Sequence, residues 1–261
     1  MTRAGVGRTY GVGVAPESVE LRSADGLRLA ASAWRAADRD PDAAVVVAHG
    51  LTITKDHPSV VAVAEALATA GFAVVAYDGR GHGGSQGLCT LGTDEVLDVA
   101  AAVTWAGAAS PRVVAVGSSM GAIAVLRYAA TDDQLAGVVA VSAPARWRIH
   151  SARALLAAAM TRTGVGRRVV ERRKGVRLAT TWTAAPAPQD VAARVSCPAA
   201  IVHGGRDRFI PPSEAVRLHD RLAGPRRLDI VEGMGHGFGA GAAEAIVGAV
   251  HWAIAARAAR L

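Results

Sequence analysis

Short apolar runs, many of them rich in valine, alternate along this chain with alanine-rich stretches that have helical spacing. A strand with apolar residues on both faces has to be covered on both faces, which is typical of parallel sheets flanked by helices. This alternation of strands and helices restricts the fold more strongly than any other feature of the sequence, and it predicts an α/β architecture. The runs that we expect to form its buried strands are residues 43–48, 72–77, 112–116, 136–142, 199–203 and 227–231.

Two further segments, residues 18–22 and 27–34, are joined by Asp25-Gly26, a pair that favours a tight turn. They predict an antiparallel hairpin at the edge of the sheet and bring the expected number of strands to eight. Residues 145–196 interrupt the alternation, and we expect them to form a short helical cap over a single domain that spans residues 1–261. Helical spacing predicts the flanking helices over residues 59–70, 93–106, 120–130, 212–222 and 242–258.

Composition excludes several classes of protein. With 51% apolar and 20% charged residues, the chain is neither disordered nor a coiled coil. Its longest uncharged stretch, residues 113–126, is shorter than the roughly 18 residues of a membrane-spanning helix. Residues 1–16 lack the apolar run of a secretory signal, so we expect a cytoplasmic protein. Cys89 and Cys197 match no metal-ligand spacing and are too few for a disulfide scaffold.

The stretch Gly117-Ser118-Ser119-Met120-Gly121 has the G-x-S-x-G pattern, in which a sharp turn between a strand and a helix lifts a serine hydroxyl above the sheet. It follows the predicted strand 112–116 and opens the predicted helix 120–130. A side chain at either glycine would collide with the neighbouring strand or helix, which explains both glycines. The context predicts Ser119 as a nucleophile.

A second match to the same pattern lies at Gly83-Gly84-Ser85-Gln86-Gly87. Neither a predicted strand nor a predicted helix adjoins it, so the strained turn that would expose the hydroxyl is missing. We therefore interpret Ser85 as a loop residue without a catalytic role.

A serine hydroxyl needs a base, and the base needs a carboxylate that orients it. Asp207 follows the predicted strand 199–203, and His236 follows the next one, so both stand at carboxyl ends, where open α/β sheets place their sites. Taken singly, Asp207 could cap a helix and His236 could be a polar loop residue. The order Ser119, Asp207, His236 predicts a catalytic triad.

Attack on an acyl group also requires donors for the developing oxyanion, commonly two backbone N–H groups. The N–H of Met120, directly after the nucleophile, is one candidate. The N–H of Leu51, after His49-Gly50 at the end of a predicted strand, is the other. His49-Gly50 could also be a simple strand terminus.

With these motifs the chain resembles the α/β-hydrolase family, in particular its branch of small serine esterases, monoacylglycerol lipases and serine aminopeptidases. The resemblance implies an eight-stranded sheet with a short helical cap, and action on esters, thioesters or amides without a metal or organic cofactor. It also implies that the Asp78 loop is structural and that His82 is not catalytic. The resemblance is carried by His49-Gly50, Asp78-Gly79-Arg80-Gly81-His82-Gly83, the Ser119 turn, Gly204-Gly205-Arg206-Asp207, Ile210-Pro211 and Gly235-His236-Gly237.

Residues 145–196 hold eleven basic and two acidic residues, a net charge of +9, whereas the rest of the chain sums to −2. The arginines could simply form a solvated helix face, or they could attract anionic lipids, coenzyme A or an acyl-carrier protein. Nucleic acid is disfavoured, because aromatic residues are 4% of the chain and no binding motif is present. We expect eight apolar residues of this segment to pack on the sheet: Trp147, Ile149, Leu155, Leu156, Met160, Val165, Val169 and Val170.

These observations predict a serine hydrolase, similar to an esterase or a lysophospholipase, that cleaves a carboxylic ester through a Ser-His-Asp triad and an acyl-enzyme intermediate. A thioesterase or an acyltransferase would use the same residues on acyl groups linked to coenzyme A or a carrier protein. A non-catalytic binding module on this fold is a third alternative, because a fold does not dictate a function.

Overall fold

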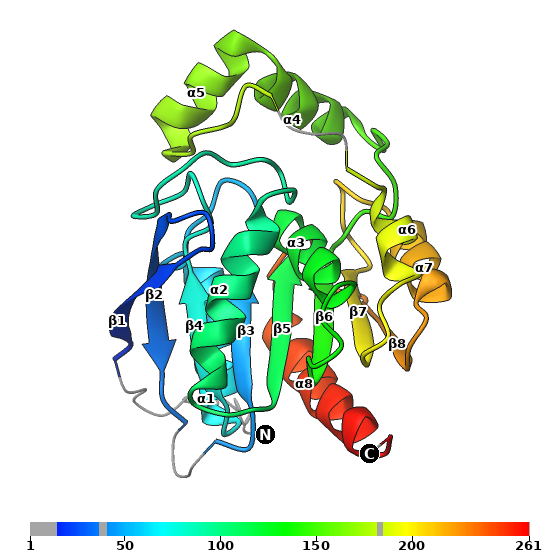
Figure 1. Ribbon diagram of the computed structural model, residues 1–261. Helices are drawn as coiled ribbons and strands as arrows, with labels where there is room; N and C mark the ends of the chain where they lie inside the picture. Colours follow the sequence, from blue (N-terminus) through cyan, green and yellow to red (C-terminus); the bar gives the residue numbers. More distant parts are fainter. Residues whose placement is uncertain (1–14, 37–40, 182–184, 261) are drawn as a thin grey trace, which may run out of the picture.

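The computed structural model describes residues 15–36, 41–181 and 185–260 (Figure 1). Most of residues 1–16, for which the sequence predicts no secretory signal, lies outside these described ranges. Eight strands form one sheet in the order β1-β2-β4-β3-β5-β6-β7-β8. The strands are β1 (Glu17–Arg22), β2 (Arg28–Trp34), β3 (Ala44–Ala48), β4 (Ala73–Tyr77), β5 (Val113–Ser118), β6 (Gly137–Val141), β7 (Ala199–Gly204) and β8 (Arg226–Val231).

The predicted α/β fold with a mostly parallel sheet is confirmed. Strands β4, β3, β5, β6, β7 and β8 pair in parallel, whereas β1 and β2 form the expected antiparallel hairpin at one edge. Each predicted strand agrees with the observed one to within two residues. Sequence alone locates these strands well, because burial on both faces demands an apolar run.

Alternate side chains of each strand enter two separate cores. In β3, Ala44, Val46 and Ala48 pack toward one face of the sheet, and Val45 and Val47 pack toward the other. This period of two is the ordinary geometry of a strand.

Helices cover both faces (Figure 1). The helices α1 (Pro58–Thr69) and α8 (Ala242–Ala258) contribute to the core on one face. On the other face, the core includes residues of α2 (Glu95–Gly107), α3 (Met120–Ala129) and α7 (Pro212–Arg221). These five helices are the ones that helical spacing predicted.

The cap segment, residues 145–196, contains three helices with different surroundings. The lid helices, α4 (Ala152–Arg162) and α5 (Gly164–Lys174), pack on each other above the carboxyl ends of the strands (Figure 1). In contrast, α6 (Pro188–Ala192) packs against α3 and α7 in the body of the molecule. Whether the segment counts as one insertion within a single domain stays a prediction.

The prediction that the apolar side chains of the cap segment pack on the sheet is wrong for most of them. Val170 is buried, but five of the eight are exposed: Trp147, Ile149, Leu155, Leu156 and Val165. The physical reason is that the lid helices stand away from the sheet, so one side of each helix has no neighbour. Charge and hydropathy along one segment do not reveal where that segment lies.

A small third core joins the lid helices to the loops beneath them. Val170 of α5 packs there with Cys89, Met120, Val176 and Leu178. The chain that returns from the lid also pairs with the loop before α2, because Cys89 donates its N–H to the Arg177 carbonyl and accepts one from Ala179. The lid is therefore attached next to the end of β5, where α3 begins.

Within the described ranges, no helix is long and apolar enough to cross a bilayer.

Candidate active site

Ser119 occupies the turn between β5 and α3, with φ of 53° and ψ of −108°. A non-glycine residue rarely adopts this backbone conformation, so the neighbours have to leave room for the turn. A Cβ on Gly117 would lie 2.5 Å from the Gly121 carbonyl carbon, and a Cβ on Gly121 would lie 2.6 Å from the His49 oxygen. Both glycines therefore have the steric role that the motif predicted.

The structure brings Ser119, Asp207 and His236 together. Nε2 of His236 lies 3.0 Å from the Ser119 hydroxyl oxygen, and Nδ1 lies 2.7 Å from Oδ2 of Asp207. The partners assign the tautomer: Nδ1–H donates to the carboxylate, and Nε2 accepts from the hydroxyl. This is the hydrogen-bonded order that a serine, a base and an orienting acid require.

Asp207 is held by more than the imidazole. Its Oδ1 accepts the backbone N–H groups of Phe209 at 2.8 Å and Ile210 at 3.0 Å. Burial alone would raise the pKa of Asp207, but the hydrogen bond and charge of His236 and the two N–H groups outweigh burial and lower it. The carboxylate therefore stays ionised and fixed in orientation at neutral pH.

Two supporting residues were missed by the sequence analysis. The Ser142 hydroxyl, directly after β6, accepts the Gly237 N–H at 3.1 Å and so anchors the loop that carries His236. The Phe209 ring lies 5.1 Å from the His236 ring, centroid to centroid. The position of Ser142 at the end of a predicted strand could have indicated a site residue. Nothing in the sequence around Phe209 indicated its contact with His236, because that contact joins two separate loops.

Both candidate oxyanion donors belong to segments that adjoin Ser119. Met120 is the first residue of α3, and a Cβ on Gly50, which precedes Leu51, would lie 3.4 Å from the Ser119 Cβ. Within the described residues, neither the Leu51 N–H nor the Met120 N–H has a hydrogen-bond acceptor. Both groups are therefore available to a ligand.

His49 shapes the loop that carries Leu51. Its Nδ1–H donates to the Gly50 carbonyl at 2.8 Å, and its Nε2 accepts the Gly79 N–H at 3.0 Å. Burial, together with the neighbouring His82, lowers the pKa of His49 to about 3, so the ring is neutral. Its role is to position the loop.

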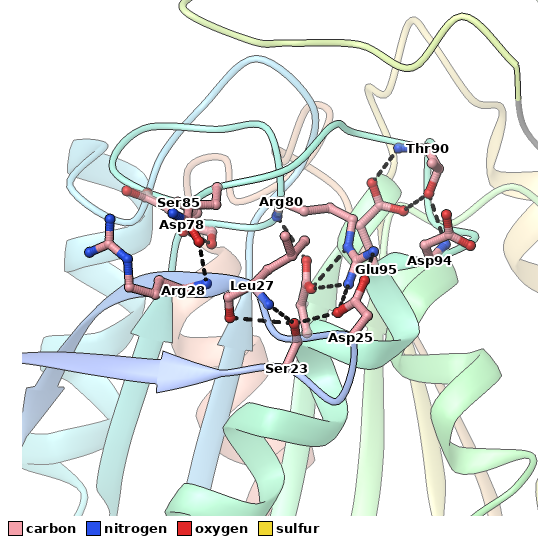
Figure 2. A network of polar contacts seen from close by, with 12 residues as sticks. Ser23, Asp25, Leu27, Arg28, Asp78, Arg80, Ser85, Thr90, Asp94 and Glu95 are labelled. Atoms are coloured by element: carbon pink, nitrogen blue, oxygen red, sulfur yellow. Dashed lines mark hydrogen bonds and ion pairs between the residues drawn. The ribbon is translucent and has the colours of Figure 1, made fainter.

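Ser85 and His82 are buried structural residues. The Ser85 hydroxyl donates to the Asp78 carbonyl and accepts the Ala30 N–H at 2.9 Å, which ties its loop to β2 (Figure 2). His82 donates from Nδ1 to the Arg80 carbonyl at 3.1 Å. Neither residue lines the pocket above Ser119.

A buried polar network supports the loop between β4 and α2 (Figure 2). The Arg80 guanidinium donates to Asp98 at 2.8 and 3.0 Å and to Asp25 at 3.0 Å. Further along the loop, Glu95 accepts the N–H and the hydroxyl of Thr90. The network fixes the part of this loop that borders the pocket.

A pocket of about 830 Å³ opens above Ser119 and His236. Apolar side chains make up much of its wall, and its charged lining residues in the described chain include Arg146, Arg148 and Arg162 but no Asp or Glu. The remaining lining residues are Leu51, Thr90, Leu91, Thr93, Pro144, Trp147, Ile149, His150, Ala154, Ala157, Ala158, Thr161, Ala185, Phe209 and Ile210. The arrangement suits an acyl group that lies near the serine.

The three arginines differ in their partners. Arg146 forms an ion pair with the buried Glu214, with Nη2 at 2.6 Å and Nε at 3.2 Å from Oε1. Burial raises the pKa of Glu214, but the hydrogen bond from Arg146 and the charge of His150 outweigh it and lower the pKa. In the described ranges, neither Arg148 nor Arg162 has a carboxylate within 4.0 Å. Two positive charges at the pocket therefore remain uncompensated.

Across the described ranges, no three His, Cys, Asp or Glu side chains are grouped in a way that could hold a metal ion. Cys89 and Cys197 are buried and free.

Comparison with known proteins is consistent with this architecture. A sequence model of the family described as serine aminopeptidase, S33, matches residues 39–185, which is more than half of the chain and includes the Ser119 turn. The match ends before Asp207 and His236. No curated protein sequence matches the chain significantly.

Three solved structures illustrate the fold. The Pyrococcus furiosus esterase Pf2001 aligns with a TM-score of 0.66 and 21% identity over 93% of this chain and 90% of its own. DcsB, solved in complex with its substrate analogue, aligns with a TM-score of 0.71 and 19% identity over 94% and 99%. Est1E from Butyrivibrio proteoclasticus, solved with ferulic acid bound, aligns with a TM-score of 0.66 and 20% identity over 92% and 99%.

At these identities the structural likeness establishes the fold, and the sequence match establishes the family. The chain has the α/β-hydrolase fold and belongs to the S33 serine aminopeptidase family of serine hydrolases.

Proposed function

We propose that this protein hydrolyses small carboxylic esters, with Ser119 as the nucleophile, His236 as the general base and acid, and Asp207 as the residue that orients the imidazole. The observation that carries the proposal is the continuous hydrogen-bonded chain from Asp207 through His236 to the Ser119 hydroxyl. Such a chain activates a hydroxyl that is otherwise a weak nucleophile at neutral pH.

The reaction proceeds in two halves. In the first, the Ser119 hydroxyl attacks the acyl carbon while Nε2 of His236 takes its proton, and the N–H groups of Leu51 and Met120 stabilise the oxyanion. The tetrahedral intermediate collapses, and His236 protonates the departing alcohol. In the second half, a water molecule gives a proton to His236, attacks the acyl-enzyme and releases the acid, which restores the Ser119 hydroxyl.

The charge of the pocket favours esters over peptides with a free amino terminus. An aminopeptidase has to accommodate a positively charged α-amino group, which a carboxylate would stabilise. Among the described residues, the pocket is lined by three arginines and by no Asp or Glu. An ammonium group would be repelled there, whereas a neutral or anionic ester would not.

A fluorophosphonate probe tests the proposal directly, because it reacts covalently with activated serines. We expect labelling of the intact protein, no labelling of Ser119→Ala, and undiminished labelling of Ser85→Ala. A panel of p-nitrophenyl esters and aminoacyl p-nitroanilides then separates esterase from aminopeptidase activity. A labelled Ser119→Ala variant, or hydrolysis of the anilides alone, would refute the proposal.

A second candidate function is favoured by Arg148 and Arg162, which line the pocket without a carboxylate partner in the described chain. Phosphate groups are good partners for guanidinium groups. This suits a thioesterase or an acyltransferase that acts on acyl groups linked to coenzyme A, with the same serine as nucleophile.

The same acyl chain presented on coenzyme A and on N-acetylcysteamine separates the two candidates. A thioesterase of this kind should prefer the coenzyme A substrate, and Arg162→Gln should raise its KM roughly tenfold or more, because a charged hydrogen bond is lost. Arg153→Gln is the matched control, since Arg153 is also on α4 and is exposed, but does not line the pocket. Equal kcat/KM for both thioesters would exclude this candidate.

A further inference from the structure

Large exposed apolar side chains are concentrated in the lid helices and in the segment just before them. The described residues include nine exposed large apolar side chains, and five of them lie between residues 147 and 165: Trp147, Ile149, Leu155, Leu156 and Val165. Single exposed apolar residues are common on protein surfaces, but a cluster in one short segment indicates an interaction surface. This cluster adjoins the mouth of the pocket, which Trp147 and Ile149 also line.

Helix α4 turns a row of small residues toward the pocket and Leu156 away from it. Ala154, Ala157, Ala158 and Thr161, at helical spacing, line the pocket. With 3.6 residues per turn, Leu156 then lies on the opposite side of the helix, where it is 64% exposed. In a helix that only covered a core, the leucines would face inward.

Helix α5 has the same division. Gly166 and Val170 are its buried residues, and Val170 belongs to the third core. Val165, Arg168 and Arg172 follow one another at intervals of three and four residues along the exposed side, and Val165 is 72% exposed. The outer surface of the lid helices therefore mixes apolar and cationic side chains.

The charge of the lid helices is strongly positive. The lid helices carry seven basic residues and one acidic residue, Glu171. No ion pair in the described part of the chain involves any of the seven. The seven are Arg153, Arg162, Arg167, Arg168, Arg172, Arg173 and Lys174.

We infer that the outer surface of the lid helices binds anionic lipid surfaces. Apolar side chains would enter the boundary between headgroups and acyl chains, while the arginines contact lipid phosphates. A second copy of this chain would place one positive surface against another, which opposes self-association through this face. An acidic protein could also neutralise the positive charge of the lid helices. However, α4 and α5 are the outermost elements of the molecule (Figure 1), so an extended planar surface can contact both helices at once. This inference does not depend on the chemistry at Ser119.

Vesicle co-sedimentation of the full chain tests the inference. We expect binding to phosphatidylcholine vesicles that contain phosphatidylglycerol, much weaker binding to phosphatidylcholine alone, and loss of binding in concentrated salt. The double variant Arg168→Gln/Arg172→Gln should weaken binding roughly thirtyfold, because each arginine near an anionic surface contributes a factor of about five. Leu155→Ser/Leu156→Ser should weaken it at least about tenfold.

The matched control lies on α7, at the flank of the sheet (Figure 1). Val216 is 43% exposed there and Arg221 is also exposed, so Val216→Ser/Arg221→Gln makes one apolar and one arginine replacement of the same kinds away from the lid. This variant should bind vesicles like the unaltered protein. Circular dichroism of each variant checks that it is folded.

Several results would overturn the inference: no vesicle binding, equal binding to both kinds of vesicle, or binding that neither lid variant weakens. Dimerisation through the lid, or capture of an acidic protein without vesicle binding, would assign the surface to a different partner. Hydrolysis of a water-soluble p-nitrophenyl ester is measured in parallel without vesicles, and the lid variants should retain it. If that hydrolysis is absent while vesicle binding persists, the proposed function fails and the lipid surface stands.

Discussion

Nε2 of His236 lies 3.0 Å from the Ser119 hydroxyl oxygen, although the two residues are 117 positions apart in the chain. The contact depends on β5 and β8 ending at the same edge of the sheet, with β6 and β7 between them. The loops that follow β5, β7 and β8 carry Ser119, Asp207 and His236, and Ser119 and His236 line the pocket above this edge.

Replacement of Ser119 by alanine should abolish turnover while the fold persists. The expected loss in kcat is about 10⁴-fold to 10⁶-fold, because no other group can form the acyl-enzyme. Ester hydrolysis and thermal unfolding are measured on the same preparation. Ser85→Ala should do the reverse: it removes two buried hydrogen bonds and lowers stability by about 1–3 kcal/mol, but each folded molecule stays active. Equal activity of Ser119→Ala and the unaltered protein would contradict the assignment.

Replacement of Asp207 by asparagine should lower kcat by about 10⁴-fold with little change in KM, because the imidazole loses its orientation. The control is Glu232→Gln, an exposed carboxylate in the loop that leads to His236, which should leave kcat unchanged. Steady-state kinetics on one soluble ester compares the two variants. Similar kcat values for both would show that Asp207 does not act through His236.

The same residue contributes to stability in a defined pH range. Because the pKa of Asp207 is lowered from 3.8, its contribution is present above pH 3.8 and is lost as the pH falls through the lower value of the folded state. Asp207→Asn should therefore reduce the free energy of unfolding at neutral pH, and the difference from the unaltered protein should shrink below pH 3.8. Urea denaturation across this range measures the difference, which a constant offset would contradict.

The Ser119 turn should tolerate no side chain at Gly121. A Cβ there would press on the backbone oxygen of His49, so Gly121→Ala should destabilise the protein by about 3 kcal/mol and shift the turn that holds Ser119. Gly107→Ala, at the end of α2 with nothing within 4 Å of the added carbon, should be neutral or stabilise by up to about 1 kcal/mol. Denaturant unfolding and ester hydrolysis of both variants check the contrast, and a stable, active Gly121→Ala would refute the steric argument.

Buried histidines should make the protein acid-sensitive well above the range of its carboxylates. Burial and His82 lower the pKa of His49 from 6.5 to about 3, so unfolding lets this imidazole take up a proton between these pH values. The free energy of unfolding should fall as the pH is lowered through that window, by up to about 1.4 kcal/mol per pH unit from His49 alone. Urea unfolding from pH 7 to pH 4 measures the slope. His49→Gln should flatten it by this amount, and an unchanged slope would show that His49 is not the group responsible.

Much of the fold and of the candidate site was predictable from local patterns. Apolar runs located the six buried strands, because a strand that is buried on both faces has to be apolar along its length. This requirement does not depend on which strands are its neighbours in the sheet. Ser119 was separated from Ser85 because the strained turn requires glycines, a preceding strand and a following helix, all within a few residues of the serine. Asp207 and His236 followed from their positions at strand ends, since parallel strands bring those ends to one edge.

Contacts between segments that are distant in the chain could not be predicted from local sequence patterns. Nothing near Glu214 in the chain indicates that it neutralises Arg146. Ser142 ends a predicted strand, but its neighbours in the chain do not indicate that its partner is Gly237 in the His236 loop. The lid is the clearest case: its leucines and valines predicted packing on the sheet, yet Leu155, Leu156 and Val165 point into solvent. The spacing of apolar residues shows which side of a helix is apolar. Whether that side packs on the protein or faces solvent depends on where the tertiary structure places the helix.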